Sequence, residues 1–301
     1  MEIPRASESE FLSYDVIPTG LPQLDRALGI RGIPTKRITE ISGSWSVGKT
    51  TLALSIVAEA QKKDMGVIWM DAEWSWDDSY AKKLGVDTAK MGLLQHRYAE
   101  SALDQLLEYV EKGKNSLLVI DSVGGLHPKD EAEKDSGERT IGAQAGLVAR
   151  FCRKIVPMLA INNNALLVIN HEYVPIMSMG GRPTVKTSGG AKLEYHKSIW
   201  IRLQRAGKNL NQGEDRIGFV VNAEIRKNKM ADTMNDVAEL ELYYGLGFSP
   251  TSDLFAMALD KGIIEKRGNR YFFGENVLGT GVTKAKEGMK QYVQEITAAM
   301  V

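Results

Sequence analysis

Residues 43–50 read Gly43-Ser44-Trp45-Ser46-Val47-Gly48-Lys49-Thr50. Their spacing matches G-x-x-x-x-G-K-[ST], the loop that binds nucleotide phosphates in many hydrolases. Residues 37–42 before it are short, β-branched and bounded by turn residues, and they predict a buried strand. Residues 51–60 after it have the composition and spacing of a helix. Because strand, glycine loop and helix form the context in which this pattern works, we expect a nucleotide-binding site here.

The side chains of this phosphate loop suit a polyphosphate. Gly43 and Gly48 allow backbone angles that other residues resist, so successive N–H groups can point at the phosphates. The N-terminus of the following helix adds partial positive charge. Lys49 can reach the β- and γ-phosphates, and the hydroxyl of Thr50 can bind Mg²⁺. A chance glycine turn before a helix is the alternative, and the flanking strand disfavours it. We predict that Gly43 to Thr51 contact the nucleotide.

The composition is that of an ordinary globular protein. The chain has 301 residues, 43% hydrophobic and 25% charged, which suits one large domain or a core with a smaller appendage. Lys and Arg number 38, as do Asp and Glu, so the net charge indicates no anionic partner. The single cysteine, Cys152, excludes an internal disulfide and suits a reducing compartment. With neither a signal peptide nor an apolar run of the ~20 residues that a membrane span needs, we expect a cytoplasmic protein.

Apolar runs elsewhere predict alternating strands and helices. Buried strands are expected at 67–70, 116–121 and 165–170, and helices at 102–110 and 147–159. This alternation predicts an α/β fold with a mainly parallel sheet, helices on both faces and ligands at the carboxyl ends of the strands. An antiparallel extension is expected from three further strands with no helix between them, at 198–203, 217–225 and 237–243.

Three regions are expected along the chain. Residues 1–32 form a short N-terminal arm and lead-in, residues 33–248 the core, and residues 249–301 a small α+β lobe. The lobe is predicted from a change of pattern after residue 250. A helix at 253–259, a hairpin around 270–273 and a final helix from Thr283 are expected there.

Two carboxylates close predicted strands beside the phosphate loop. Asp121 ends the apolar run 117–120, where a carboxylate directed at Mg²⁺ belongs, although a helix cap is the alternative. Glu73 follows the neighbouring run as Asp71-Ala72-Glu73. From there it can act as a base or orient water for attack on a γ-phosphate. For Glu73 the alternative is a surface acid, and its place at a strand tip argues against that.

The order of these motifs resembles the RecA-type recombinases of bacteria and phages. The matching stretches, which keep the family's order, are 43–51, 71–73, Asp77 with Tyr80 in 77–87, 117–122, 146–150, 168–171, Gly189-Gly190 and Lys227-Asn228-Lys229. The resemblance implies a RecA-like ATPase core with ATP and Mg²⁺ as cofactors. It also implies self-association into a helical filament on single-stranded DNA, and engagement of double-stranded DNA during strand exchange.

The resemblance further implies roles for single residues at the nucleotide. Glu73 would be the general base and Asp121 the carboxylate on the magnesium side. Asp77 would contact the adenine amino group, and Tyr80 would stack on the base.

Other residues would report on the nucleotide or complete its site. Asn170 and His171 would sense the γ-phosphate and couple it to the loop that follows. The family more often has glutamine at the position of His171, and a histidine can still donate one hydrogen bond. Lys227 and Lys229 match family lysines that reach the ATP of a neighbouring subunit and stabilise transition-state charge. An exposed basic strand end is the alternative for these two lysines.

Contact with DNA is expected in two loops and on one helix face. The first loop spans 130–142 and is longer than the bacterial pattern. The second spans 172–190 and is too long for an ordinary connection. On the helix 147–159 the basic side chains face away from the apolar ones and could follow a phosphate backbone, with a solvated face as the alternative. The predicted DNA-binding residues are Arg139, Arg150, Arg153, Met179, Arg182, Lys186, Gly189 and Gly190.

The chain also departs from the family. Gly180 stands where bacterial members carry a phenylalanine, so Ile176, Met177 or Met179 would supply the apolar wedge between bases. Glu194 replaces a usual lysine, and the family's N-terminal packing helix is missing or shortened before residue 15. These departures keep open a second function, an accessory or regulatory ATPase of the same fold that acts on a protein partner without strand exchange.

Overall fold

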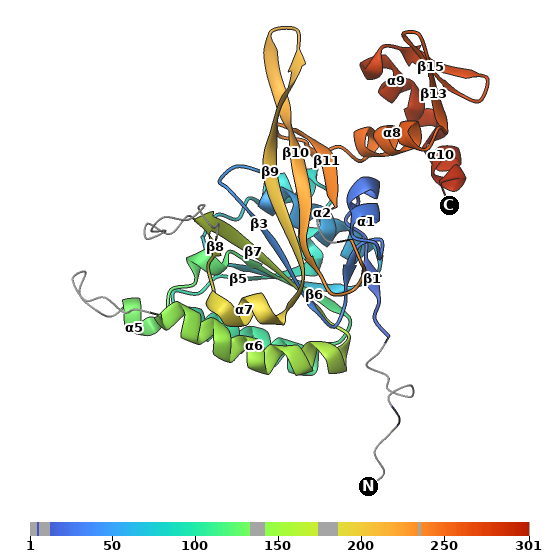
Figure 1. Cartoon of the computed structure of the whole chain (residues 1–301). Coiled ribbons are helices and arrows are strands. Elements are labelled where there is room, and N and C mark those ends of the chain that lie inside the picture. Colours follow the sequence, from blue (N-terminus) through green and yellow to red (C-terminus); the bar gives the residue numbers. More distant parts are fainter. Residues whose placement is uncertain (1–4, 6–12, 133–141, 174–185, 234–235, 301) are drawn as a thin grey trace, which may run out of the picture.

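The computed structural model describes residue 5 and residues 13–132, 142–173, 186–233 and 236–300. Its central element is a ten-stranded sheet with the order β12-β11-β10-β9-β3-β7-β6-β4-β5, and β8 pairs with β7 beside this path (Figure 1). The strands are β3 (Ile38–Gly43), β4 (Gly66–Asp71), β5 (Met91–Leu94), β6 (Ser116–Asp121), β7 (Ala165–Tyr173), β8 (Lys186–Thr187), β9 (Lys197–Gln212), β10 (Asp215–Asn228), β11 (Val237–Tyr243) and β12 (Gly247–Phe248).

The direction of the strands changes at β9. Neighbouring strands run parallel along the part of the sheet with the order β9-β3-β7-β6-β4-β5. The short β8 is antiparallel to β7. From β9 to β12 each strand is antiparallel to the next. The predicted parallel core with an antiparallel extension is therefore confirmed. The β9–β10 hairpin is longer than predicted and projects beyond the sheet (Figure 1).

Helices cover both faces of the parallel strands. The helices of the core are α2 (Lys49–Lys62), α3 (Asp78–Lys83), α4 (Ala99–Lys112), α5 (Lys129–Ala132), α6 (Ala143–Asn162) and α7 (Gly190–His196). Along β6, Leu117 and Val119 pack in a core cluster with α2, whereas Leu118 and Ile120 pack in a second cluster with α4 and α6. This alternation is the period of two that a strand buried on both faces requires.

The apolar face predicted for the helix around 147–159 is confirmed on the longer α6. The residues of that face are all buried: Leu147, Val148, Phe151, Ile155 and Leu159. Cys152 is buried as well. Pro157 lies inside α6. Two other predictions were incomplete. β7 continues past residue 170 to Tyr173, and the edge strand β5 was not predicted because it is short and only partly buried.

The described residues before β3 pack into the apolar core of the sheet, whereas those after β12 form a small lobe. The lead-in contains α1 (Pro22–Ala27) and β1 (Val16–Ile17), which pairs with β2 (Ile33–Pro34) at the start of the predicted core. The C-terminal lobe has its own apolar core around Phe255, Tyr271 and Met289. Its elements are α8 (Pro250–Asp260), β13 (Ile264–Arg267), β14 (Arg270–Phe273), β15 (Asn276–Thr280), α9 (Val282–Met289) and α10 (Val293–Ala299). The predicted hairpin is thus part of a three-stranded sheet.

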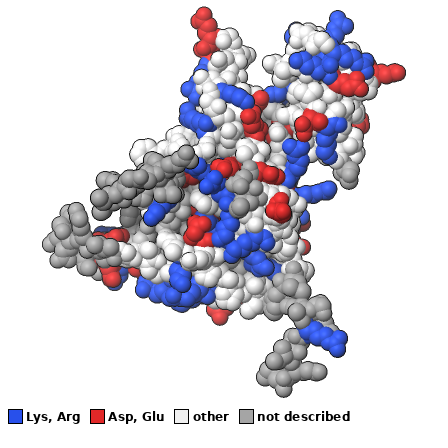
Figure 2. Space-filling view, in the orientation of Figure 1, with Lys and Arg blue, Asp and Glu red and all other residues white. Residues whose placement is uncertain are grey.

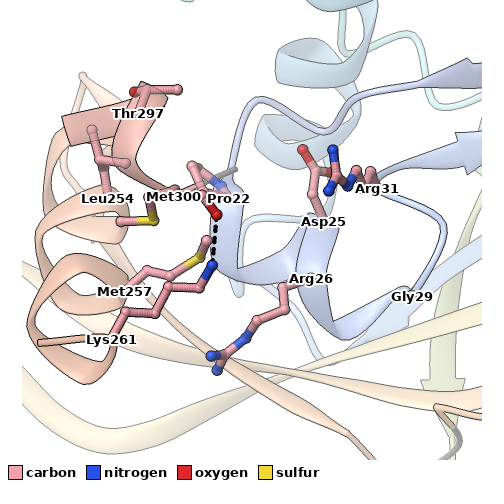
Figure 3. Close-up of a pocket in the computed structure, with 10 residues that line it drawn as sticks. All are labelled: Pro22, Asp25, Arg26, Gly29, Arg31, Leu254, Met257, Lys261, Thr297 and Met300. Atoms are coloured by element: carbon pink, nitrogen blue, oxygen red, sulfur yellow. Dashed lines mark hydrogen bonds between the residues drawn. The ribbon is translucent and has the colours of Figure 1, made fainter. Parts of the chain in front are cut away.

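The C-terminal lobe contacts the lead-in through polar groups. The Asp253 carboxylate accepts hydrogen bonds from the backbone N–H of Gln23 at 2.7 Å and from its side-chain amide at 2.9 Å. Beside this contact, a pocket of about 380 Å³ is lined by residues of α1, α8 and the C-terminal end of the chain (Figure 3). At its wall, Nζ of Lys261 donates to the carbonyl oxygen of Met300. The residues that line this pocket do not include any of the predicted nucleotide-binding residues.

Within the described residues, no helix combines the length and the apolar character that a membrane crossing requires.

Candidate active site

The predicted nucleotide residues meet at one edge of the sheet. The phosphate loop follows β3, Glu73 follows β4, Asp121 ends β6, and His171 lies near the end of β7. The parallel register places Gly43 opposite His171 and Asp71 opposite Asp121. Carboxyl ends of parallel strands are where open α/β sheets bind ligands, so the sheet itself assembles the site.

Of the two glycines expected to adopt unusual backbone angles, Gly48 does so, whereas Gly43 ends β3 and is not among the glycines with positive φ. Gly48 has φ of 98°, and a Cβ at this position would lie 2.5 Å from Cδ1 of Leu242. The left-handed conformation therefore favours glycine, and a Cβ would also require the Leu242 side chain to move. Lys49 is buried, and its Nζ donates to the carbonyl oxygens of Gly43 at 3.1 Å and Ser44 at 2.8 Å. Burial lowers the pKa of Lys49, and the carboxylates of Asp121 and Glu73 oppose that effect.

Thr50 and Asp121, the two residues predicted to hold Mg²⁺, lie beside each other. Oγ1 of Thr50 donates to Oδ2 of Asp121 at 2.9 Å, and burial raises the pKa of Asp121 to about 6. A divalent cation beside this carboxylate would favour its ionised form and would suit the hydroxyl oxygen. Among the described residues, no group of three or more His, Cys, Asp and Glu side chains could hold a metal ion. One carboxylate and one hydroxyl nonetheless fit Mg²⁺, which keeps several water ligands in proteins.

Glu73 is held by two donors on one carboxylate oxygen. Oε1 accepts from the hydroxyl of Ser122 and from Nε2 of His171, the latter at 2.9 Å. These bonds, that of His171 first, outweigh burial and lower the pKa of Glu73 to about 2. Ser122 was not among the predicted site residues, although it directly follows Asp121. Its position one residue after a predicted strand tip was the available signal.

The loop that carries Glu73 is shaped by Asp71. The buried carboxylate of Asp71 accepts from the backbone N–H groups of Ser75 at 3.1 Å and Trp76 at 3.0 Å, and from the amide of Gln95 at 2.8 Å. These bonds fold the chain back just beyond Glu73. The aspartate of the Asp71-Ala72-Glu73 motif is therefore a structural residue here.

The two residues predicted to contact adenine lie at α3. Asp77 caps α3: its Oδ1 accepts from the backbone N–H of Tyr80 at 2.9 Å and from the hydroxyl of Ser79 at 2.8 Å. The hydroxyl of Tyr80 lies 3.0 Å from Oγ1 of Thr51 in α2. Tyr80 is thus tied to the helix that follows the phosphate loop, whereas Asp77 has a capping role that the resemblance did not imply.

The residues predicted to sense the γ-phosphate connect the site to the second loop. Asn170 is buried, and its side-chain amide exchanges two hydrogen bonds with the backbone of Ser188, at 2.8 and 3.1 Å. The next residue, His171, contacts Glu73. β7 therefore carries one contact to Glu73 and one to Ser188, near the far end of the second loop.

Glu172 was predicted as the first residue of that loop but lies in β7, where an ion pair that the sequence did not predict holds its side chain. Arg202 in β9 donates Nε and Nη2 to the two oxygens of Glu172 at 2.8 and 2.9 Å, and Ser42 donates its hydroxyl at 2.9 Å. The side chains of Arg202 and Glu172 are 17% and 9% exposed. Arg202 and Glu172 are 30 positions apart and belong to no local sequence pattern, so no sequence signal pointed to this pair.

Comparison with known proteins shows the family of the chain. Residues 2–249 match the family model described as the RecA N-terminal domain. The chain is 39% identical to Protein RecA of Thermus aquaticus over 302 aligned residues, which cover 99% of this chain and 88% of that protein. It is also 39% identical to Protein RecA of Aquifex aeolicus, over 95% of this chain and 81% of that protein.

The chain belongs to the RecA family of DNA recombinases, which are DNA-dependent ATPases. Nucleotide use follows from membership of this family.

The two lysines that the RecA resemblance assigns to a neighbouring subunit are bound within the chain here. Nζ of Lys227 donates to the carbonyl oxygen of Glu194, and Nζ of Lys229 donates to that of Tyr195 at 2.9 Å. Both carbonyls belong to the last turn of α7, where cations are favourable. Glu194, which the resemblance places where a lysine is usual, forms an ion pair with Lys197 at 2.7 Å.

The predicted DNA-binding residues are only partly covered by the described structure. Arg139, Met179 and Arg182 lie outside the described residues. Arg150 and Arg153 are exposed on α6, where cationic side chains gather at the edge of the core (Figure 2). Lys186 is exposed in β8, which pairs with the end of β7 and closes the second loop.

The glycine pair at the end of this loop has a conformational role. Gly189 and Gly190 have φ of 93° and 72°, and Gly189 caps the N-terminus of α7. A Cβ on Gly189 would lie 3.0 Å from side-chain atoms of both Leu193 and Val123. These glycines are therefore explained by the turn into α7 without any contact to DNA.

Proposed function

We propose that this RecA-family protein binds ATP with Mg²⁺ at the edge of the sheet and polymerises as a helical filament on single-stranded DNA. In this filament it pairs the bound strand with a homologous duplex and promotes strand exchange. We further propose that it acts in the cytoplasm, which its single buried cysteine supports.

One observation carries the proposal. The phosphate loop with Lys49, the Thr50–Asp121 pair and Glu73 come from separate segments and lie together at the carboxyl ends of β3, β4 and β6. Phosphoryl transfer needs a phosphate cradle, a cation and a group that positions water, and these residues supply each.

In the proposed reaction, the loop N–H groups and Lys49 hold the β- and γ-phosphates. Thr50 and Asp121 would hold Mg²⁺, which neutralises charge on the phosphate oxygens when it is bound. Glu73 would accept the proton of the attacking water. Asn170 and His171 would report the γ-phosphate to the second loop, whose closing strand begins at Lys186.

Lys227 and Lys229 would act on the ATP bound by a neighbouring copy. Lys227 and Lys229 project from the end of β10, and the phosphate loop follows β3, so the two surfaces belong to different parts of the protein. A contact between two different surfaces is heterologous and generates a ring or an open helix, which supports a filament. To reach another copy, both lysines must leave the carbonyl oxygens of α7.

The exposed arginines of α6 and the stem of the second loop would follow the DNA backbone.

We also propose a division into a lead-in of residues 1–32, an ATPase core of 33–248 and a C-terminal lobe of 249–301. The separate apolar core of the lobe supports that boundary.

The deciding experiment measures ATP turnover with Mg²⁺, with and without single-stranded DNA, in the parent and in Lys49→Ala. We expect strong stimulation by DNA in the parent, and loss of nucleotide binding in Lys49→Ala because the buried ammonium is removed. ATP turnover by the parent that single-stranded DNA does not change would contradict the proposed function and favour an accessory ATPase.

A further inference from the structure

The contact between His171 and Glu73 restricts what either residue can do. Nε2 of His171 lies 2.9 Å from Oε1 of Glu73. Nδ1 of His171 is buried without a hydrogen-bond partner among the described residues. A proton on Nδ1 would be a buried donor without an acceptor, so the proton is expected on Nε2, from where it bonds Glu73.

A single N–H cannot serve two acceptors at full strength. In the proposed function His171 donates to the γ-phosphate, yet its only expected N–H is bound to the carboxylate that must activate water. Occupation of one acceptor therefore weakens the bond to the other. His171 therefore cannot make a full-strength hydrogen bond to Glu73 and to the γ-phosphate at the same time.

The side chains on either side of His171 are held by neighbours. Asn170 bonds Ser188, and Glu172 is clamped by Arg202 and Ser42. Successive side chains of a strand point to opposite faces, so these bonds do not hold the His171 side chain itself. An exchange of partners therefore requires no rearrangement of β7.

We propose that His171 and Ser122 are positioning residues that hold Glu73 away from the attacking water, and that the γ-phosphate frees Glu73 by taking the Nε2–H of His171. This inference rests on the proposed function, in which Glu73 is the base. Two donors on one oxygen stabilise the ionised carboxylate and make it a poor proton acceptor. While His171 bonds Glu73, as in the protein without DNA, ATP turnover is kept low; in the DNA-bound filament the γ-phosphate captures His171 and hydrolysis starts.

The test measures kcat and KM for ATP without DNA in a set of variants. His171→Ala should raise the DNA-free kcat about tenfold, the effect of one hydrogen bond to a charged group, with little change in KM. Ser122→Ala should raise it in the same direction. His171→Gln keeps an N–H donor and should give a smaller rise than His171→Ala. His96→Ala is the matched control, because His96 bonds Gln105 and should leave kcat unchanged.

The outcomes separate this inference from the proposed function. If His171→Ala has a DNA-free kcat at or below that of the parent, while Glu73→Gln is inactive, the proposal that His171 restrains Glu73 is refuted. If His171→Ala does not fold, an unchanged kcat in Ser122→Ala overturns it equally. Parental turnover in Glu73→Gln would overturn the proposed base itself, and the restraint with it.

Discussion

Replacing Arg202 with alanine should destabilise the core by about 3 kcal/mol, because it leaves the carboxylate of Glu172 nearly buried and unpaired. The pair has two short bonds, at 2.8 and 2.9 Å, and its side chains are only 17% and 9% exposed. Removing one partner of a buried pair costs about 3–5 kcal/mol. The remaining bond from Ser42 and the residual exposure place this case at the lower end.

Urea unfolding provides the measurement, with Arg202→Ala, Glu172→Ala and the double variant forming a cycle. The double variant should lose less stability than the sum of the two single variants, because no unpaired charge remains. Arg226→Ala is the control: Arg226 bonds Glu224 at 2.9 Å but is 41% exposed, so its loss should cost at most about 1 kcal/mol. If Arg202→Ala costs no more than this control, the clamp does not stabilise the core.

Four further predictions concern the reaction, the subunit contact, DNA and pH. Glu73→Gln should keep ATP binding but lower kcat by at least ~100-fold, and parental turnover would assign the base elsewhere. Lys227→Ala and Lys229→Ala should each abolish DNA-stimulated hydrolysis without loss of folding. Activity should partly return on mixing either with Glu73→Gln, and no recovery in confirmed mixed filaments would contradict catalysis between subunits. Lys186→Ala should weaken binding to all single strands alike and reduce the salt slope by about 0.7, whereas an unchanged slope would remove this residue from the DNA site. Burial raises the pKa of Asp253 to about 7 from 3.8, so the folded state binds the proton more tightly, and stability should fall as pH rises from about 4 to about 7. Asp253→Asn should flatten this dependence in thermal unfolding, and an equal slope in both proteins would assign it to other groups.

Several parts of the site could be predicted because their signals are local. The phosphate loop is a contiguous pattern, and its meaning depends on a strand and a helix that immediately flank it. Asp121 and Glu73 follow apolar runs, and carboxyl ends of parallel strands meet at one edge, so their proximity could be inferred without coordinates.

Other features gave no usable local signal. β5 spans only Met91–Leu94 and is partly exposed at the edge of the sheet, so its pattern is weak. The resemblance suggested that Asp77 contacts the base, but it could not indicate that its Oδ1 caps α3. Lys227 and Lys229 were expected at a subunit contact, and their bonds to the end of α7 depend on how β10 packs beside that helix.

The sequence alone determined the phosphate loop, the alternation of strands and helices, and the identity of the carboxylates, because each depends on residues close together in the chain. Only the tertiary structure decided which side chains share a hydrogen bond. His171 and Glu73 are 98 positions apart, and Arg202 and Glu172 are 30 apart. A hydrogen bond acts over about 3 Å, and the sheet register that brings such distant residues to this distance is set by the packing of the whole core.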